Sequence, residues 1–124
     1  MKTQTGTYTN GVTWEATYDE NGNRLTYQDS KGYSSKSTYD ENNKELTYQN
    51  SNGYTWEASY DENGNRLTYR NSDGFSSSST YDKKGHLITY QNSDGFSTKS
   101  TYDENGNHLT SQNSAGYSWK RSNK

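Results

Sequence analysis

Apolar and polar side chains alternate along two short runs that recur through the chain. In NRLTYQ, from Asn23 to Gln28, Leu and Tyr alternate with Arg, Thr and Gln, and YSSKSTY, from Tyr33 to Tyr39, alternates in the same way. A period of two in runs rich in Thr, Tyr and Ser is typical of β-strands. The segments DENGN and NSDG lie between such runs, and their Asn-Gly and Asp-Gly pairs favour tight turns. The pattern therefore predicts antiparallel hairpins.

The whole phrase repeats with a fixed period. Tyr-Asp pairs recur every 21 residues, and so does the Gly of the second turn. Self-similarity at a fixed interval indicates a repeat protein. We expect an all-β fold in which antiparallel β-hairpin repeats of 21 residues form one elongated, curled or spiralling meander sheet, similar to a solenoid, with about eleven strands. A single domain would cover residues 1–124, with a half-repeat at 1–17, repeats starting at 18, 39, 60 and 81, and a C-terminal cap repeat at 102–124.

Alternation also assigns side chains to the two faces of this sheet, because successive residues of a strand point in opposite directions. Leu25 and Tyr27 should share one face, opposite Arg24 and Thr26. Stacked over the repeats, one face carries structural ladders of aromatic and aliphatic residues: Tyr18, Tyr39, Tyr60, Tyr81 and Tyr102; Leu25, Leu46, Leu67, Ile88 and Leu109; Trp14 and Trp56. The turns should use Gly22, Gly32, Gly53, Gly64, Gly74, Gly85, Gly95 and Gly106.

The two Trp positions indicate how the aromatic face is covered. Trp14 and Trp56 are followed two residues later by Ala16 and Ala58, whereas the repeats with Ser35 and Ser77 have Ser there as well. Large side chains beside small ones are typical of tapering interiors. We therefore expect the rings to pack inside the protein.

Composition changes this picture only in part. Hydrophobic residues make up 23% of the chain and the mean hydropathy is −1.54, values typical of disorder, but 15% of the residues are aromatic, which argues for order. The net charge of −2 gives no footprint for nucleic acid or an anionic membrane. The start MKTQTGTYTNGV has no apolar run, and the chain has no Cys. We expect a cytoplasmic protein without membrane or nucleic-acid partners.

The repeat resembles a known family. YDENGNRLT, followed by a second Gly turn and a return to TYD, is similar to the YD repeat of Rhs-type proteins and teneurins, and the match covers essentially the whole chain. In that family the repeats form a spiralling β-hairpin sheet that builds a shell around a toxin or other cargo. The resemblance implies the hairpin sheet here, but not the shell, since five Tyr-Asp units are too few to enclose a cargo.

Two further departures from the family matter. Leu25, Leu46 and Leu67 stand one residue later after Tyr-Asp than the Leu of the family, so the pairing at this turn should contain an extra bulge residue. The proline-containing self-cleavage region of Rhs cores and a toxin domain are absent from the sequence, which has no Pro. The activity of the family is therefore not expected to carry over.

Candidate chemistry is sparse. Asp19-x-Asn21-x-Asn23 is similar to the start of a calcium loop, but it lacks the Gly at the sixth position and the distal Glu, so a hairpin turn is the better explanation. His86 and His108 occupy positions that hold Asn or Arg in other repeats, and we expect them to be solvated. No Ser, His and Asp positions recur together as a triad. We expect no catalytic residues, no metal site, no cofactor and no enzymatic activity.

The repeat is broken at the C-terminus, where Trp119, Lys120, Arg121 and Lys124 form a basic cluster. This segment is either a polar cap of the last edge strand or a partner contact with Trp119 and Arg121 as anchors. The chain is therefore expected to be a protein-binding module, as a stoichiometric inhibitor or an accessory protein from a bacterium, mobile element or phage. The alternatives are a carbohydrate-binding module that uses Tyr and Trp ladders and a purely structural repeat. A homodimer through the sheet is also an open alternative.

Overall fold

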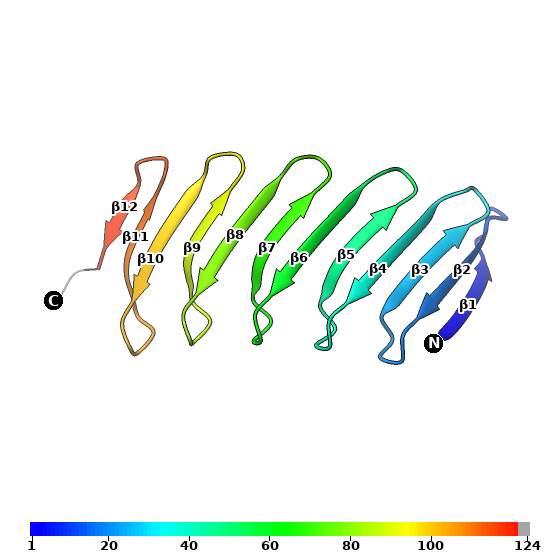
Figure 1. The fold of residues 1–124 in the computed structure, drawn as a ribbon, viewed down its shortest axis with the longest axis horizontal. Coiled ribbons are helices and arrows are strands. Elements are labelled where there is room, and N and C mark those ends of the chain that lie inside the picture. Colours follow the sequence, from blue (N-terminus) through cyan, green and yellow to red (C-terminus); the bar gives the residue numbers. More distant parts are fainter. Residues whose placement is uncertain (122–124) are drawn as a thin grey trace. The chain divides into compact units, whose positions relative to one another are not determined.

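Residues 1–121 are described by a computed structural model, and within them every regular element is a strand (Figure 1). No helix in this part of the chain could cross a membrane. The sequence predicts about eleven strands; the structure has twelve over the described range. The strands are β1 (Lys2–Thr7), β2 (Thr13–Tyr18), β3 (Arg24–Asp29), β4 (Ser34–Tyr39), β5 (Glu45–Asn50), β6 (Thr55–Tyr60), β7 (Arg66–Asn71), β8 (Ser76–Tyr81), β9 (Leu87–Asn92), β10 (Ser97–Tyr102), β11 (His108–Asn113) and β12 (Ser118–Lys120).

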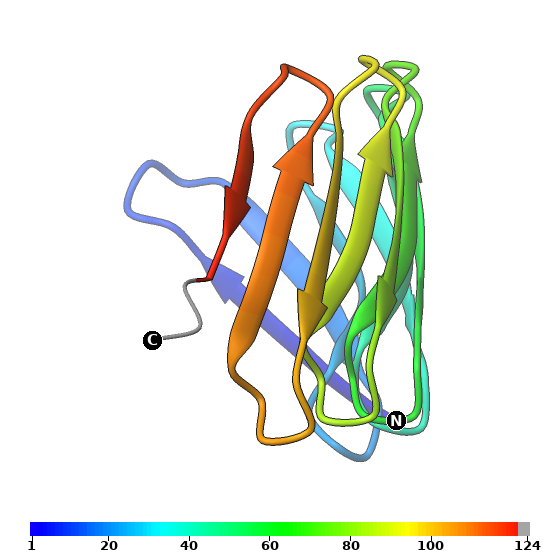
Figure 2. The same cartoon turned by 90° about the vertical axis from the view of Figure 1, so that its left-hand side faces the viewer.

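The strands follow one another in chain order in a single antiparallel sheet that is not closed into a barrel. This confirms the predicted all-β hairpin meander. The chain forms two compact units: unit 1 holds Met1–Ala58 with Asn71–Asp73, and unit 2 holds Ser59–Arg70 with the described residues from Gly74 onward. Figure 2 shows β10, β11 and β12 of unit 2, with their connecting turns at opposite ends of the strands.

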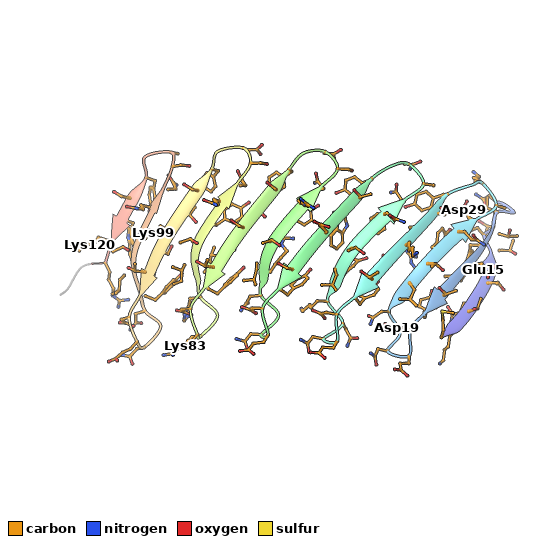
Figure 3. All side chains as sticks on the ribbon, viewed as in Figure 1. Glu15, Asp19, Asp29, Lys83, Lys99 and Lys120 are labelled. Atoms are coloured by element: carbon orange, nitrogen blue, oxygen red, sulfur yellow. The ribbon has the colours of Figure 1, made fainter. Side chains whose placement is uncertain are left out.

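One turn geometry recurs at both ends of the strands. In the turn after β2, Oδ1 of Asp19 accepts hydrogen bonds from the backbone N–H groups of Asn21 and Asn23, both at 2.9 Å. Gly22 has a φ of 86° and donates its N–H to the carbonyl of Asp19. At the opposite end of the strands, Oδ1 of Asp29 accepts hydrogen bonds from the backbone N–H groups of Lys31 and Tyr33 in the same way. Asp19 and Asp29 lie at opposite ends of β3 (Figure 3).

Serine residues join neighbouring hairpins at the end of the strands where Asp29 lies. The backbone N–H of Thr13 donates to Oγ of Ser30 at 3.0 Å, and the N–H of Ser30 donates to the carbonyl of Thr13. Equivalent bonds from a strand start to the Oγ of a Ser seventeen residues later involve Ser51, Ser72, Ser93 and Ser114. The Ser that recurs in each of these turns thus has a structural role that strand alternation did not reveal.

The bulge predicted from the Leu positions is confirmed. Thr17 pairs with Thr26 and Tyr18 pairs with Arg24, so Leu25 is the extra residue. The same shift occurs in the β4–β5, β8–β9 and β10–β11 pairs. The bulge turns Arg24 onto the face of Tyr27, whose ring centre lies 5.0 Å from the guanidinium carbon. The prediction that Arg24 lies opposite Tyr27 is therefore wrong, because a bulge interrupts simple alternation.

The two faces of the sheet differ in chemistry. The aromatic face carries Trp14, Tyr27 and their equivalents, and the polar face carries Thr, Ser, Gln and charged residues. On the polar face, Oγ1 atoms of Thr17 and Thr26 lie 2.6 Å apart. Four further hydroxyl pairs at the same distance complete a hydroxyl row: Thr38 with Thr47, Ser59 with Thr68, Thr80 with Thr89, and Thr101 with Thr110.

The sheet has almost no enclosed core. Among the described residues, Ala16 is the one buried apolar residue, at 1% exposure, and no large side chain is fully buried. Ala16 pairs with Tyr27, so a small side chain lies where rings from both sides converge. The expectation that the rings pack inside the protein is not met, because the sheet stays open and its aromatic face is only half-buried.

Candidate functional site

The aromatic face of unit 1 is a continuous set of ring contacts. The ring centres of Tyr8 and Trp14, and of Trp14 and Tyr27, are 6.4 Å apart, and those of Tyr27 and Tyr33 are 6.0 Å apart. Tyr8 and Tyr27 share a hydrogen bond between their hydroxyl groups at 3.0 Å, and this bond raises the pKa of Tyr27 to about 12. The rings thus hold one another in place, with the hydroxyl groups paired.

The next hairpin of unit 1 repeats this arrangement. Tyr33 and Tyr48 join their hydroxyl groups at 2.7 Å, and the Tyr48 ring stacks on Trp56 at 6.4 Å with an interplanar angle of 19°. Tyr39 lies at the bulge end of the same face, where its hydroxyl donates to the carbonyl of Arg24 at 2.9 Å. The surface combines Tyr, Trp and Arg, the residue types enriched in the energetic centres of protein interfaces.

In unit 2, a column of four rings replaces the Tyr ladder at the bulge end. The ring centres of His86 and Tyr102 are 4.6 Å apart, those of Tyr102 and His108 are 5.0 Å apart, and those of His108 and Trp119 are 4.8 Å apart. Nε2 of His108 has no accessible surface and no hydrogen-bond partner. The prediction that His108 is solvated is wrong, because its ring is packed between those of Tyr102 and Trp119. His86 is partly solvated, with 33% of its side chain exposed, although its ring stacks on Tyr102.

His86 also closes its own turn. Its Nδ1 lies 3.0 Å from Oδ2 of Asp82, and its backbone N–H donates to Oδ1 of Asp82 at 2.8 Å. These bonds, the backbone bond first, lower the pKa of Asp82. In the equivalent turn of unit 1, Asn23 makes the same two bonds to Asp19. His86 therefore substitutes for a turn residue, and its ring nitrogen is engaged in the turn.

The same turns account for the calcium-like sequence. Oδ1 of Asp19 accepts from two backbone N–H groups, and Oδ2 accepts from Nδ2 of Asn23 at 3.0 Å. The backbone bond from Asn23 is the main cause of the lowered pKa of Asp19. Both carboxylate oxygens thus stabilise the turn. Over residues 1–121, no three acidic or His side chains come together as a metal-binding group.

Among the described residues, four exposed large apolar side chains of the aromatic face lie in unit 2, and Tyr8, at 46%, lies in unit 1. A single replacement explains two of them: Ser111 stands where the other repeats have Tyr27, Tyr48, Tyr69 and Tyr90. Ser111 pairs with Trp119, so Trp119 and the preceding Tyr117 lack the Tyr ring that Trp56 and Tyr54 contact in unit 1. We call the following four residues, with their exposed fractions, the aromatic patch: Leu87 (37%), Phe96 (40%), Tyr117 (56%) and Trp119 (40%).

The predicted C-terminal cluster is divided between the two faces. Trp119 belongs to the aromatic patch, whereas Lys120 pairs with Thr110 and so lies on the polar face. Arg121 donates its N–H to the carbonyl of Leu109. The pKa of Asp103 is lowered mainly by the backbone bond from Asn107, and the charge of Arg121 adds a smaller effect. Lys124 lies outside the described residues. A role of these residues in binding stays a prediction, and Leu87, Phe96 and Tyr117, which lie on the same exposed face as Trp119, were not among the predicted binding residues.

The hollows of the polar face are shallow grooves. One in unit 1 has a volume of about 780 Å³ and is lined in part by Thr5, Thr13, Glu15 and Gln28. One in unit 2 has a volume of about 590 Å³, with Gln91, Lys99 and Gln112 in its lining. Figure 3 labels Glu15 and Lys99 on their strands. These grooves offer hydroxyl and amide groups for hydrogen bonding but no paired acid and base.

No protein-family model and no curated protein sequence matches the chain. Solved structures do match it. The crystal structure of TcdB2-TccC3 is similar over 83% of this chain, with a TM-score of 0.60 and 21% identity. The Tc holotoxin pore of Photorhabdus luminescens, with a mutated TccC3, is similar over 86%, with a TM-score of 0.62 and 20% identity. In both cases the match covers 6% of the other chain.

At this level of identity the likeness concerns the fold. The matched chains contain YD/Rhs repeats, so the resemblance to YD-repeat proteins is confirmed at the level of the hairpin sheet. The matches fall on repeat-shell regions of a toxin complex. The chain is a repeat module of that architecture, and it spans only a small part of the length of the proteins it matches.

Proposed function

We propose that the chain is a non-enzymatic repeat module that binds a protein partner through its aromatic face. The observation that carries the proposal is the open aromatic face, since Ala16 is the one buried apolar residue in the described range. A sheet with one apolar face is stable when that face is covered. The aromatic patch and the Tyr, Trp and Arg side chains around it supply the residue types of interface centres.

The ring geometry favours a protein over a sugar as the ligand. Sugar rings stack on an aromatic ring whose flat side is open. Here the rings of Trp14 and Tyr27, and of Tyr48 and Trp56, are nearly parallel, but a tilted ring stands beside each pair: Tyr33 at 57° to Tyr27 and Tyr54 at 57° to Tyr48. Tilted rings present edges and corners, which suit the irregular side chains of a protein surface. A stoichiometric role, as an inhibitor or accessory protein, is one form of this function.

Two matched double variants test the proposal. Leu87→Glu with Tyr117→Glu adds two negative charges to the aromatic face. Gln91→Glu with Ser118→Glu adds the same charge to the polar face of β9 and β12, where Ser118 pairs with Gln112. Position 87 holds Arg24, Glu45, Arg66 and His108 in the other repeats, so the fold accepts a polar side chain there.

Each tagged variant and the unchanged chain would be used as bait in bacterial lysate at moderate salt, with an untagged copy of the same chain added so that capture of a second copy can be told from the bait by its mass. We expect one protein in stoichiometric amount with the unchanged chain and the polar-face variant, and its loss with the aromatic-face variant. Capture that is indifferent to the aromatic-face variant, or no capture by any bait, would contradict the proposal.

A further inference from the structure

The accessible surface of the chain is larger than that of a compact monomer. It amounts to 8722 Å² for a mass of 14.2 kDa. Compact monomers of this mass expose about 6,800 Å². The excess, about 1,900 Å², is consistent with a sheet whose second layer is missing.

The described part of the chain contains nothing that could serve as this second layer. All of its strands belong to one sheet. The polar face of this sheet is lined by the hydroxyl row and by Gln and charged residues. Hydroxyl and amide groups lose their hydration when they are buried without partners, which makes the polar face a poor cover for rings. A cover for the aromatic face must therefore come from another surface of matching chemistry.

We propose that a second copy of the chain supplies this cover, with the aromatic faces of the two copies packed against each other. The inference rests on the proposed function and names the partner. Packing of two sheets face to face, about 10 Å apart, is the usual way in which antiparallel sheets with one apolar face form a core. An isologous contact uses the same surface on both copies, so one aromatic face is enough to define the interface.

The charges on the aromatic face are compatible with such self-association. Arg24 and Glu45 occupy the same position in consecutive repeats of unit 1, where the bulge turns the side chain to the aromatic face. Both lie near Tyr39: Tyr39 pairs with Glu45, and its hydroxyl donates to the carbonyl of Arg24. The aromatic face therefore carries both signs of charge, so that the faces of two copies can attract each other. A face with a single sign of charge would instead repel its copy.

The area agrees with a permanent dimer. If each copy buried its excess, the interface would total about 3,800 Å², within the range of about 2,000–5,000 Å² found for obligate homodimers. The aromatic patch adds the exposed apolar side chains that such interfaces need, with Trp119 and Phe96 each 40% exposed. An edge-to-edge contact between β1 of one copy and β12 of another would leave the aromatic face open and would extend without limit.

Sedimentation velocity of the purified, full chain tests the inference. We expect a single species of twice the mass of 14.2 kDa at concentrations of roughly 20–200 µM. The aromatic-face variant should dissociate at least about tenfold more readily, whereas the polar-face variant should remain a dimer. Far-ultraviolet circular dichroism of each variant would show whether the strands are retained.

The outcomes separate this inference from the proposed function. A monomer at the highest concentration, together with capture of a different protein through the aromatic face, would overturn the second copy as partner and leave the proposed function standing. A monomer that captures nothing would overturn both. A dimer that resists the aromatic-face variant but dissociates with the polar-face variant, or an open-ended series of oligomers, would also overturn the inference. If the aromatic-face variant loses its strands, the sedimentation mass of the unchanged chain alone tests the inference.

Discussion

Trp14 lies directly over Gly6. A Cβ atom on Gly6 would be 2.7 Å from Nε1 and 2.8 Å from Cε2 of the indole ring. Gly6 pairs with Trp14 across β1 and β2, at the position that Tyr27 and Tyr48 hold in the following repeats. The first Trp thus fills the space of a missing Tyr, and the absence of a side chain at Gly6 makes this possible.

Gly6→Ala should therefore destabilise unit 1, by about 1–3 kcal/mol, because the indole must move away from β1. Denaturant unfolding followed by circular dichroism measures the change. In a Trp14→Ser background, which reproduces the Ser35 and Ser77 of other repeats, the same change should be close to neutral. An equal cost in both backgrounds would show that the indole is not the cause.

Asn43 is the one non-glycine residue with a positive φ in the described range, at 67°. Asn43→Ala should lower the stability by about 1 kcal/mol, because a Cβ-bearing residue without an amide is disfavoured in this conformation. Asn43→Gly, which reproduces the Gly of the equivalent turns, should change the stability little, although it removes the acceptor for Nδ2 of Asn23 at 2.8 Å. Thermal unfolding of the two variants would compare them, and a stable Asn43→Ala variant would contradict the argument.

The Asp turns should make the fold sensitive to acid. Backbone bonds from Asn65, followed by its side-chain bond, hold the pKa of Asp61 below its usual value of 3.8. A group with a lowered pKa in the folded state stabilises the fold above its usual pKa, and this contribution is lost as the pH falls through the lowered value. The melting temperature should therefore fall below about pH 4.

Asp61→Asn is the control for this effect. Asn50 Oδ1 accepts the N–H groups of Asn52 and Tyr54 in an equivalent turn, so an amide can replace the carboxylate without loss of those bonds. The variant should fold at neutral pH. It should lose less stability in acid than the unchanged chain, because the contribution of Asp61 is gone, and the rest of the loss should persist, because Asp19, Asp82 and Asp103 remain. An identical acid dependence in scanning calorimetry would show that Asp61 contributes nothing.

The Tyr8 and Tyr27 pair should be visible in an alkaline titration. The hydrogen bond that the neutral Tyr27 hydroxyl shares with Tyr8, followed by desolvation, raises the pKa of Tyr27 from 10.0 to about 12. A raised pKa means that this stabilising contribution is complete below pH 10.0 and is lost as the pH rises through about 12. Tyr8→Phe should return one tyrosine to ionisation near its usual pKa, as measured by tyrosinate absorbance. An unchanged titration curve would mean that the pair does not form.

Ser111→Tyr should repair the interrupted ladder in unit 2. A Tyr at this position would face Trp119 as Tyr48 faces Trp56. The added aromatic pair should stabilise the chain by about 0.5–1.5 kcal/mol. Gln112→Tyr, on the polar face of the same strand, is the matched control and should have a smaller effect in denaturant unfolding. A loss of stability would instead indicate that His108 cannot give up its contact with Trp119.

Much of the fold was predictable because every repeat carries the same pattern of strand and turn residues. The interval between Tyr-Asp pairs fixes the hairpin length, and the Gly in each turn indicates where the chain reverses. The bulge was predictable from Leu25, since its place after Tyr-Asp is one residue out of step. The face on which Arg24 lies was not predictable. Simple alternation assumes that each residue pairs with one partner, and it cannot show where two residues of a bulge share a partner.

The candidate site was less predictable, because it depends on pairs of replacements in different strands. His108 looked like a solvated substitute for Arg24, and only the loss of the Tyr at position 111 brings its ring against Trp119. Trp119 itself was identified from the broken repeat at the C-terminus. The exposure of Leu87 follows from the bulge, which turns it to the aromatic face.

The recurring turn has a consequence for how such a chain can change. Removal of residues 19–39 would join Tyr18 to Asp40, and Tyr18 would then meet Glu45 as Tyr39 does now. The backbone N–H groups of Asn42 and Lys44 would still donate to the Asp40 carboxylate, and only the bond from Asn23 to Asn43 would be lost from this turn. Deletion or duplication of one 21-residue repeat can therefore shorten or lengthen the protein by a whole hairpin, so that its size can evolve faster than its chemistry.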